Sequence, residues 1–230
     1  WCMYIKILIN ALQKFYSIDA KQLFDKEKTI DERTMVGCVY RYMWCQLKQI
    51  GDSTVDIDIE YNRKSCDYNG KDREKGIVLC KAEQQTNRCP HLNSCREILR
   101  KEMLAKKKET DKISFRPDII IHVRNHMQNF MHIEFKKCSR AGKRLNKSEV
   151  VFDIAKVRYS TCQKLGYKYH EGVVVLLGKN GFSAVQFRGG RLVGRLTGNS
   201  DSENLECCDE LERGKSTTEM AYKYLLEGIN

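Results

Sequence analysis

Two apolar runs that stand close together constrain the fold of this chain more than any other feature. Residues 116–121 read Arg-Pro-Asp-Ile-Ile-Ile, and residues 132–137 read His-Ile-Glu-Phe-Lys-Lys. Short runs of β-branched and aromatic residues separated by a polar segment predict two paired, buried strands. If the turn between them is centred on His126, residues equally far from His126 lie opposite each other, and Asp118 then faces Glu134.

The predicted pairing brings two carboxylates together. Directly opposed residues of an antiparallel pair hold their Cβ atoms about 4.5–5.5 Å apart. Carboxylates at this separation raise each other's pKa unless a cation lies between them. Mg²⁺ takes such oxygen ligands and keeps positions open for water and phosphate. Lys136 leaves the same face of the strand as Glu134 and could orient or deprotonate a water molecule. The pattern indicates hydrolysis of phosphodiester bonds.

Pro117-Asp118 followed by Glu134-Phe135-Lys136 resembles the signature of the PD-(D/E)xK nuclease superfamily. Segments 32–37 and 58–63 are also similar to a group of poorly characterised bacterial nuclease-like proteins. The resemblance implies a restriction-endonuclease-like α/β fold, with a mixed sheet and the element order αβββαβ. It implies that Asp118, Glu134 and the Phe135 carbonyl hold Mg²⁺ or Mn²⁺, and that Lys136 is the catalytic lysine. An exposed hairpin with solvated charges is the alternative, against which the flanking apolar runs argue.

Glu32 has two interpretations. With Thr29 it has the spacing of a capping box, which would serve only the start of a helix. It also precedes Val36 and Val39 on the predicted inward stripe of that helix, and the resemblance implies an additional acidic ligand there. We therefore include Glu32 among the candidate metal ligands and catalytic residues.

Candidate substrate-binding residues lie on neighbouring elements. Asn62 and Arg63 end a predicted strand and could contact phosphate or form a surface turn. Asp153 and Lys156 stand three residues apart on a predicted helix and could form a simple ion pair. The resemblance implies that this helix lines the cleft, so Lys156 is a further candidate for substrate binding.

Other polar residues near the predicted strands are harder to assign. Glu60 shares a strand face with Asp56 and Asp58, and three acids would be costly on a fully buried face. His122 and His132 flank the hairpin, and each is expected to be packed or exposed rather than a general base. His122 is the better functional candidate, because the similar bacterial group has a His after its Pro-Asp strand.

Periodicity predicts the remaining elements. Helices are expected over residues 1–24, 29–50, 148–165 (capped by Ser148) and 216–227, and strands over 55–61, 172–178 and 182–187. The polar stretch 64–112 is expected to be a cysteine-bearing insertion with a helical patch near 94–107, and the acidic stretch 199–214 a loose segment. We divide the chain into an N-terminal helical segment (1–28), a nuclease-like core (29–198) and an acidic loop with a C-terminal helix (199–230).

Charge indicates the class of partner. The net charge is +11, and between Arg96 and Lys147 fifteen Lys/Arg stand against six Asp/Glu, a surplus of nine. A basic field around a phosphodiesterase site favours nucleic acid, and DNA is expected rather than RNA. Lys143 and Arg144, in the basic loop after the second strand, are candidate phosphate contacts. The protein could also pair as a homodimer, as many members of the superfamily do.

Eleven scattered cysteines without an export signal favour thiols in a reducing cytoplasm over a disulfide framework. No apolar run approaches the roughly eighteen residues of a membrane span, so no membrane partner is expected. Cys80, Cys89, His91 and Cys95 could hold a structural zinc ion. Their spacing is not the paired Cys-x-x-Cys of a zinc ribbon, and ordinary thiols beside a helix are the alternative.

The sequence thus predicts a Mg²⁺-dependent nuclease that hydrolyses nucleic acid with an Asp/Glu/Lys site. The alternative is a catalytically silent module of the same fold that binds nucleic acid or protein.

Overall fold

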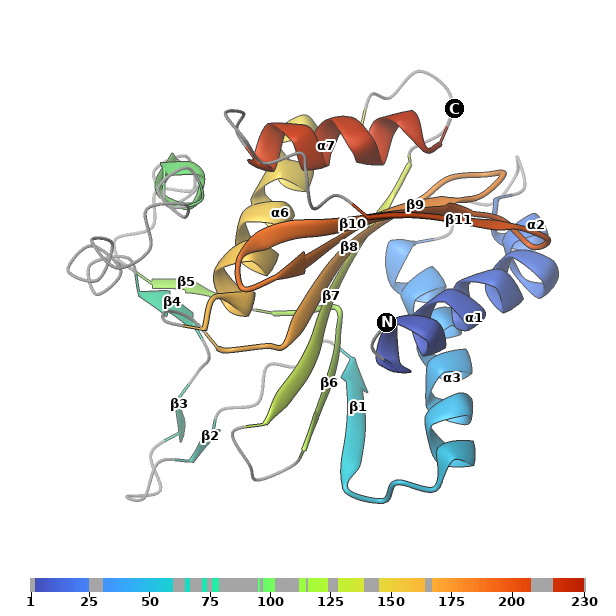
Figure 1. Cartoon of the computed structure of the whole chain (residues 1–230), viewed down its shortest axis with the longest axis horizontal. Helices are drawn as coiled ribbons and strands as arrows, with labels where there is room; N and C mark the ends of the chain where they lie inside the picture. Colours follow the sequence, from blue (N-terminus) through green and yellow to red (C-terminus); the bar gives the residue numbers. More distant parts are fainter. Residues whose placement is uncertain are drawn as a thin grey trace.

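The described residues of the computed structural model form a mixed seven-stranded sheet with helices on both faces (Figure 1). They comprise residues 3–24, 31–59, 65–66, 72–73, 76–78, 95, 97–101, 112–114, 116–123, 128–138, 145–163, 167–207 and 217–229. The predicted α/β class with a mixed sheet is confirmed.

The strand order in this sheet is β1-β6-β7-β8-β9-β10-β11. The strands are β1 (Val55–Ile59), β6 (Ile119–Val123), β7 (Asn129–Lys137), β8 (Glu171–Leu177), β9 (Phe182–Arg188), β10 (Arg191–Gly198) and β11 (Glu203–Cys207). Neighbouring strands are antiparallel except for β7 and β8, which are parallel. A parallel pair needs a crossover connection, and α6 (Lys147–Thr161) supplies it.

The predicted register of the central hairpin is confirmed. Ile119 pairs with Ile133, Ile120 with His132 and Ile121 with Met131, each pair equally far from His126, and a bulge follows at His122. A register is strongly specified where one residue of slippage would turn buried apolar side chains toward the opposite face. Here both strands are buried on both faces along most of their length.

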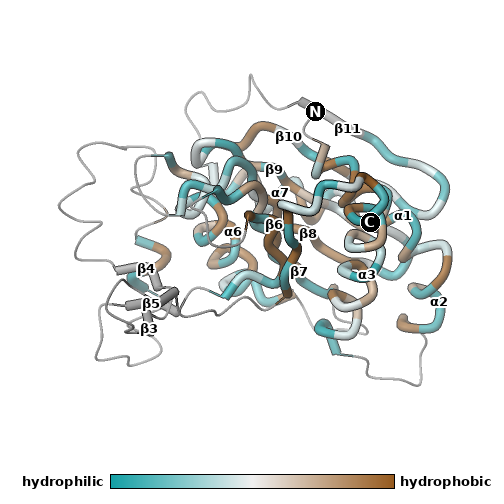
Figure 2. The backbone as a smooth tube through the Cα atoms, turned by 90° about the horizontal axis from the view of Figure 1, so that it is seen from below, coloured by the Kyte–Doolittle hydropathy of each residue, from teal (hydrophilic) through white to brown (hydrophobic). Residues whose placement is uncertain are grey.

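Two helical layers enclose the central strands. The first contains α1 (Met3–Ile18), α2 (Ala20–Leu23) and α3 (Glu32–Ile50), which share a core with Ile133 and Phe135 of β7. The second contains α6 and α7 (Thr217–Glu227), which pack with Val174 and Leu176 of β8. In Figure 2 the apolar strands β6, β7 and β8 run between α6 and α3.

Helix ends differ in part from the predictions. Asp31, not Thr29, caps α3, and its side chain accepts a hydrogen bond from the Arg33 amide. Asn146, not Ser148, caps α6, because its side-chain oxygen accepts from the Ser148 amide and hydroxyl. Gly51 ends α3 with a left-handed φ of 78°, a conformation that glycine adopts without a Cβ penalty.

The C-terminal third contains more sheet than predicted. β10 was not expected, and β11 lies in the stretch 199–214 that we expected to be loose. Both strands are largely polar and carry glycine or acidic residues, which weakens the alternation signal. They extend the sheet beyond β9 by antiparallel pairing.

The predicted insertion contains short strands that form two separate two-stranded sheets. In the first, β2 (Ser65–Cys66) pairs with β3 (Asp72–Arg73), and in the second, β4 (Gly76–Val78) pairs with β5 (Lys112–Ser114), which extends just beyond the predicted end of the insertion. Its helical residues include Cys95 and Leu99, which are buried against Ile120 of β6 and Ala155 of α6. The insertion therefore contributes to the layer that covers the α6 face of the sheet. In the part of the chain described above, no helix is long and apolar enough to cross a membrane.

Candidate active site

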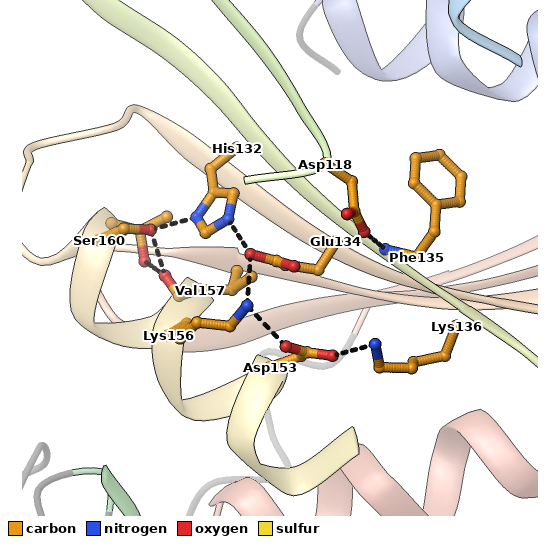
Figure 3. Close-up of polar contacts among 10 residues, drawn as sticks. Asp118, His132, Glu134, Phe135, Lys136, Asp153, Lys156, Val157 and Ser160 are labelled. Carbon is orange, nitrogen blue, oxygen red and sulfur yellow. Dashed lines mark hydrogen bonds and ion pairs between the residues drawn. The ribbon is translucent and has the colours of Figure 1, made fainter. Parts of the chain in front are cut away.

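A cluster of charged side chains lies between β7 and α6 (Figure 3). Alternate residues of a strand share a face, and His132, Glu134 and Lys136 of β7 thereby reach the face that α6 covers. Residues three or four positions apart share one side of a helix, and Asp153 and Lys156 of α6 contact Lys136 and Glu134 of the strand. The centre of the cluster is thus built by two elements that pack directly on each other.

Glu134 lies at the centre of this cluster and is 2% exposed. Its Oε1 atom accepts from Lys156 Nζ at 2.9 Å and contacts His132 Nε2 at 2.8 Å. Burial raises the pKa of Glu134 to about 7, with Asp153 acting in the same direction and Lys156 opposing it. A buried carboxylate of this kind requires a cation or a proton near neutral pH.

His132 connects Glu134 to Ser160 of α6. The His132 Nδ1 atom lies 2.7 Å from Ser160 Oγ, and the Ser160 hydroxyl donates to the Val157 carbonyl at 2.9 Å. Because that hydroxyl has one hydrogen, its oxygen accepts from Nδ1–H, and the Nε2–Oε1 contact with Glu134 then holds a shared proton. The structure thus places His132 against the central carboxylate. His122, favoured from the sequence, instead contacts Asp58 at 2.9 Å.

Asp118 lies just before β6 and is the second predicted acid. Its Oδ2 accepts a hydrogen bond of 2.7 Å from the Phe135 amide. Burial and the charge of Glu134 raise the pKa of Asp118 to about 8, although the Phe135 amide and Lys156 act against this. Asp118 and Glu134 are therefore brought together as the sequence predicted. The Phe135 amide lies against Asp118, and the role of the Phe135 carbonyl as a metal ligand stays a prediction.

Lys136 and Glu32 form the outer end of the cluster. Lys136 Nζ lies 3.1 Å from Asp153 Oδ2 and 3.5 Å from Glu32 Oε1. Burial alone would lower the pKa of Lys136, but Asp153 and Glu32 outweigh it and raise the pKa. Lys136 thus pairs with acids of α3 and α6. The other oxygen of Glu32 accepts from the Lys137 amide at 2.8 Å, so α3 is tied to the end of β7.

Asp153 is the site residue whose role the sequence did not reveal. The predicted Asp153–Lys156 pair is present, with Nζ 2.7 Å from Oδ1. Asp153 also holds Lys136, and it is 3% exposed. The sequence did contain one indication of this role. Asp153 lies on the predicted buried side of its helix, and an acid in that position needs a cationic partner. The identity of that partner depends on the packing of α6 on β7, which periodicity does not supply.

The solvent exposure of the side chains falls from Glu32 and Lys136 at one end of the cluster to His132 at the other. The side chains of Glu32 and Lys136 are 31% and 21% exposed, those of Asp153 and Glu134 are 5% and 3% exposed, and that of His132 is fully buried. The cluster therefore opens to solvent at Lys136 and Glu32.

The donor set of the cluster fits a hard divalent cation. Within the described ranges there is no group of three or more His, Cys, Asp or Glu side chains arranged to hold a metal ion. The Asp118–Glu134 pair supplies two carboxylates, and Mg²⁺ commonly binds through one or two carboxylates with water completing its shell. Glu32 contacts Lys136 and the Lys137 amide, and its role as a metal ligand stays a prediction.

Several predicted residues lie outside the described residues. They are Thr29, Glu60, Asn62, Arg63, Cys80, Cys89, His91, Lys143 and Arg144. Of the proposed zinc ligands only Cys95 is described, and it is buried in an apolar cluster with Leu99. The zinc site stays a prediction.

Comparison of the chain with family models, with curated proteins and with solved structures found no match.

Proposed function

We propose that this protein is a metal-dependent nuclease that hydrolyses phosphodiester bonds at the Asp118–Glu134 pair. The observation that carries the proposal is the approach of the buried Glu134 and the partly buried Asp118, each with a raised pKa, beside Lys136 on the same strand as Glu134. Mutual repulsion and burial leave both acids poorly neutralised, which is the condition that a divalent cation relieves.

Charge balance supports a single divalent cation. The cluster contains four carboxylates, those of Glu32, Asp118, Glu134 and Asp153, against the ammonium groups of Lys136 and Lys156. One negative charge remains while His132 and Glu134 share a proton, and two negative charges remain once that proton leaves. One Mg²⁺ or Mn²⁺ ion would balance them, with Asp118 and Glu134 as its ligands.

Each residue has a distinct role in this proposal. When bound, the cation would lower the pKa of a water molecule and stabilise charge on the scissile phosphate. Lys136, at the open end of the cluster, would orient the attacking water or neutralise the phosphate. Asp153 holds the Lys136 ammonium in place, and His132 with Ser160 fixes the orientation of Glu134. The strand and helix that carry these groups pack directly on each other, which favours a preorganised site.

The arrangement of elements supports the same proposal. The chain passes through α3 and β1, then through the insertion, and then through β6, β7, α6 and β8 in that order. We propose that these elements correspond to the αβββαβ core that the sequence resemblance implies. The basic surplus between Arg96 and Lys147 favours a polyanionic substrate, and we propose DNA as the first substrate to test.

A panel of nucleic acids tests the proposal. Purified protein would be incubated with supercoiled plasmid, linear duplex DNA, single-stranded DNA and RNA, each with Mg²⁺, with Mn²⁺ or with EDTA. We expect cleavage of at least one substrate that requires the metal and stops with EDTA. Binding of nucleic acid without cleavage in either metal would identify the alternative, a silent binding module.

A further inference from the structure

Lys156 occupies an unusual position for a substrate-binding residue. Its ammonium group lies 2.9 Å from Glu134 Oε1 and 2.7 Å from Asp153 Oδ1, and its side chain is 10% exposed. A phosphate-binding lysine ordinarily presents its charge toward solvent or substrate. Lys156 instead turns its charge inward, onto one of the two carboxylates that we propose as metal ligands (Figure 3).

A divalent cation and this ammonium group act on the same carboxylate. Like charges at a few ångströms in a partly buried site repel strongly, because the effective dielectric constant there is far below that of water. The charge of Lys156 also acts on Asp118 and favours its ionised form. Lys156 therefore supplies to Glu134 and Asp118 part of the positive charge that a metal ion would otherwise supply.

Lys156 keeps other partners if it gives up Glu134. Asp153 Oδ1 is its closer contact, and the Phe152 ring centroid lies 5.4 Å from Nζ. A cation over an aromatic face is stabilised by the ring quadrupole. The ammonium group could thus move away from Glu134 without becoming an uncompensated buried charge, which would be strongly destabilising.

We propose that Lys156 is an internal counter-ion that competes with the divalent cation for Glu134 and so sets the metal concentration at which the site fills. The inference rests on the proposed function, since it concerns the same pair of carboxylates. It replaces the role of Lys156 as a substrate contact, expected from the sequence, with one in controlling metal affinity. Lys156 is a positioning residue in this scheme.

Direct metal titration of three proteins tests the inference. Mn²⁺ binding would be measured by electron paramagnetic resonance of the free ion for the wild type, Lys156→Met and Lys147→Met. Lys147 is a matched control because it lies on the same helix, with its side chain 57% exposed and paired to Glu219. We expect Lys156→Met to lower the dissociation constant at least about tenfold, which corresponds to about 1.4 kcal/mol, and Lys147→Met to leave it unchanged.

Two further variants keep the test decisive. Lys156→Arg retains the positive charge and should bind Mn²⁺ about as weakly as the wild type. Lys156→Gln retains a hydrogen-bond donor without charge, and it replaces Lys156→Met in the comparison if the methionine variant does not fold. The counter-ion role is supported if the uncharged variant binds Mn²⁺ more tightly than the wild type and Lys156→Arg does not.

The possible failures are distinguishable. If a folded, uncharged variant binds Mn²⁺ no more tightly than the wild type, the counter-ion role is wrong while the proposed metal site stands. If the wild type binds no Mn²⁺, or if Asp118→Asn binds it as tightly as the wild type does, the proposed site itself is wrong. Activity is not needed for either conclusion.

Discussion

Asp118 and Glu134 hold protons more tightly than ordinary carboxylic acids do, with pKa values of about 8 and about 7. In the unfolded chain the same groups lose their protons near pH 4. Protonation therefore contributes stability that is fully present below about pH 4 and is lost as the pH rises through 7 and 8. In the proposed function, a bound divalent cation would replace the lost protons and offset this destabilisation.

The first prediction concerns this exchange of protons for metal. The rise in melting temperature on adding Mg²⁺ should be small at about pH 5.5 and larger at about pH 8.5, because protons compete with the metal only at the lower pH. Differential scanning calorimetry at both pH values measures it. In Asp118→Asn the rise at the higher pH should largely disappear. A rise that is equal at both pH values would show that the metal binds elsewhere.

The second prediction separates two adjacent lysines. Lys136 points into the cluster, whereas Lys137 lies 5.7 Å over the ring of Phe24. Lys136→Ala should reduce cleavage by about 100-fold or more, the usual contribution of a group that assists proton transfer or charge stabilisation. Lys137→Ala should cleave at close to the wild-type rate. Single-turnover cleavage gives the rates, and a gel-shift assay checks that both variants still bind the substrate.

Equal activity of the two lysine variants would remove Lys136 from the mechanism. Loss of binding together with activity in Lys136→Ala alone would reassign it to substrate contact. Circular dichroism of both variants shows whether the fold is retained.

At the scale of single residues, the sequence predicted Asp118, Glu134 and Lys136 as site residues but not the partners of these side chains. The apolar pattern around Asp118 and Glu134 determined the strand register, and the register brought the two acids together. The partners come from α6. The sequence does not reveal how this helix packs on β7, so it cannot show which side chains of the helix and the strand meet. Asp153 was therefore read as a local helix pair, and His122 was favoured over His132.

Among the secondary-structure elements, α6 carries half of the site and must lie close to the sheet. Gly172 of β8 permits this approach, since a Cβ atom there would lie 2.7 Å from Thr161 Cγ2 and still closer to Val157. Val157 and Thr161 are within one turn of Lys156 and Ser160. The position of the helix and the geometry of the cluster are thus coupled through one small residue.

The third prediction follows from this contact. Gly172→Ala should lower the free energy of unfolding by about 1–3 kcal/mol, the usual cost of overpacking a core, and it should also reduce cleavage because α6 must shift away from β7. Gly37→Ala is a matched control, since a Cβ at Gly37 meets no atom within 4 Å. Urea denaturation measures the free energy of unfolding of both variants, and the cleavage assay measures their activity. A Gly172→Ala protein as stable as the wild type would contradict the tight α6–β8 contact.

Elements with strong apolar patterns were predicted well, and polar ones were not. β8 and β9 are buried along nearly their whole length. β8 contains the continuous apolar run 173–177, and β9 is mainly apolar with Ser183 and Gln186 inside it. β10 alternates buried and partly buried residues and contains Gly194 and Gly198, so its pattern resembled a loop. A strand of this kind is stabilised by pairing with β9 rather than by its own composition.

Over the whole molecule, the excess of basic residues should govern how nucleic acid binds. The fourth prediction is that the affinity for a generic DNA duplex falls with salt, with log K changing by about −0.9 per phosphate contact for each unit of log salt concentration. Charge reversal of Lys143 and Arg144 should make this slope shallower by about two phosphate contacts. Fluorescence anisotropy across a salt series measures the slope, and an affinity insensitive to salt would indicate a different kind of partner.

The central claim is that the Asp118–Glu134 pair holds the metal for phosphodiester hydrolysis, and one pair of variants tests it most directly. Glu134→Gln removes the charge of the central carboxylate at nearly constant volume, and Glu149→Gln makes the same change at the exposed start of α6. Mg²⁺-dependent cleavage of the substrate that the wild type cuts should fall by about 100-fold or more in Glu134→Gln and stay unchanged in Glu149→Gln. A folded Glu134→Gln protein that cleaves at the wild-type rate in saturating Mg²⁺ would contradict the account.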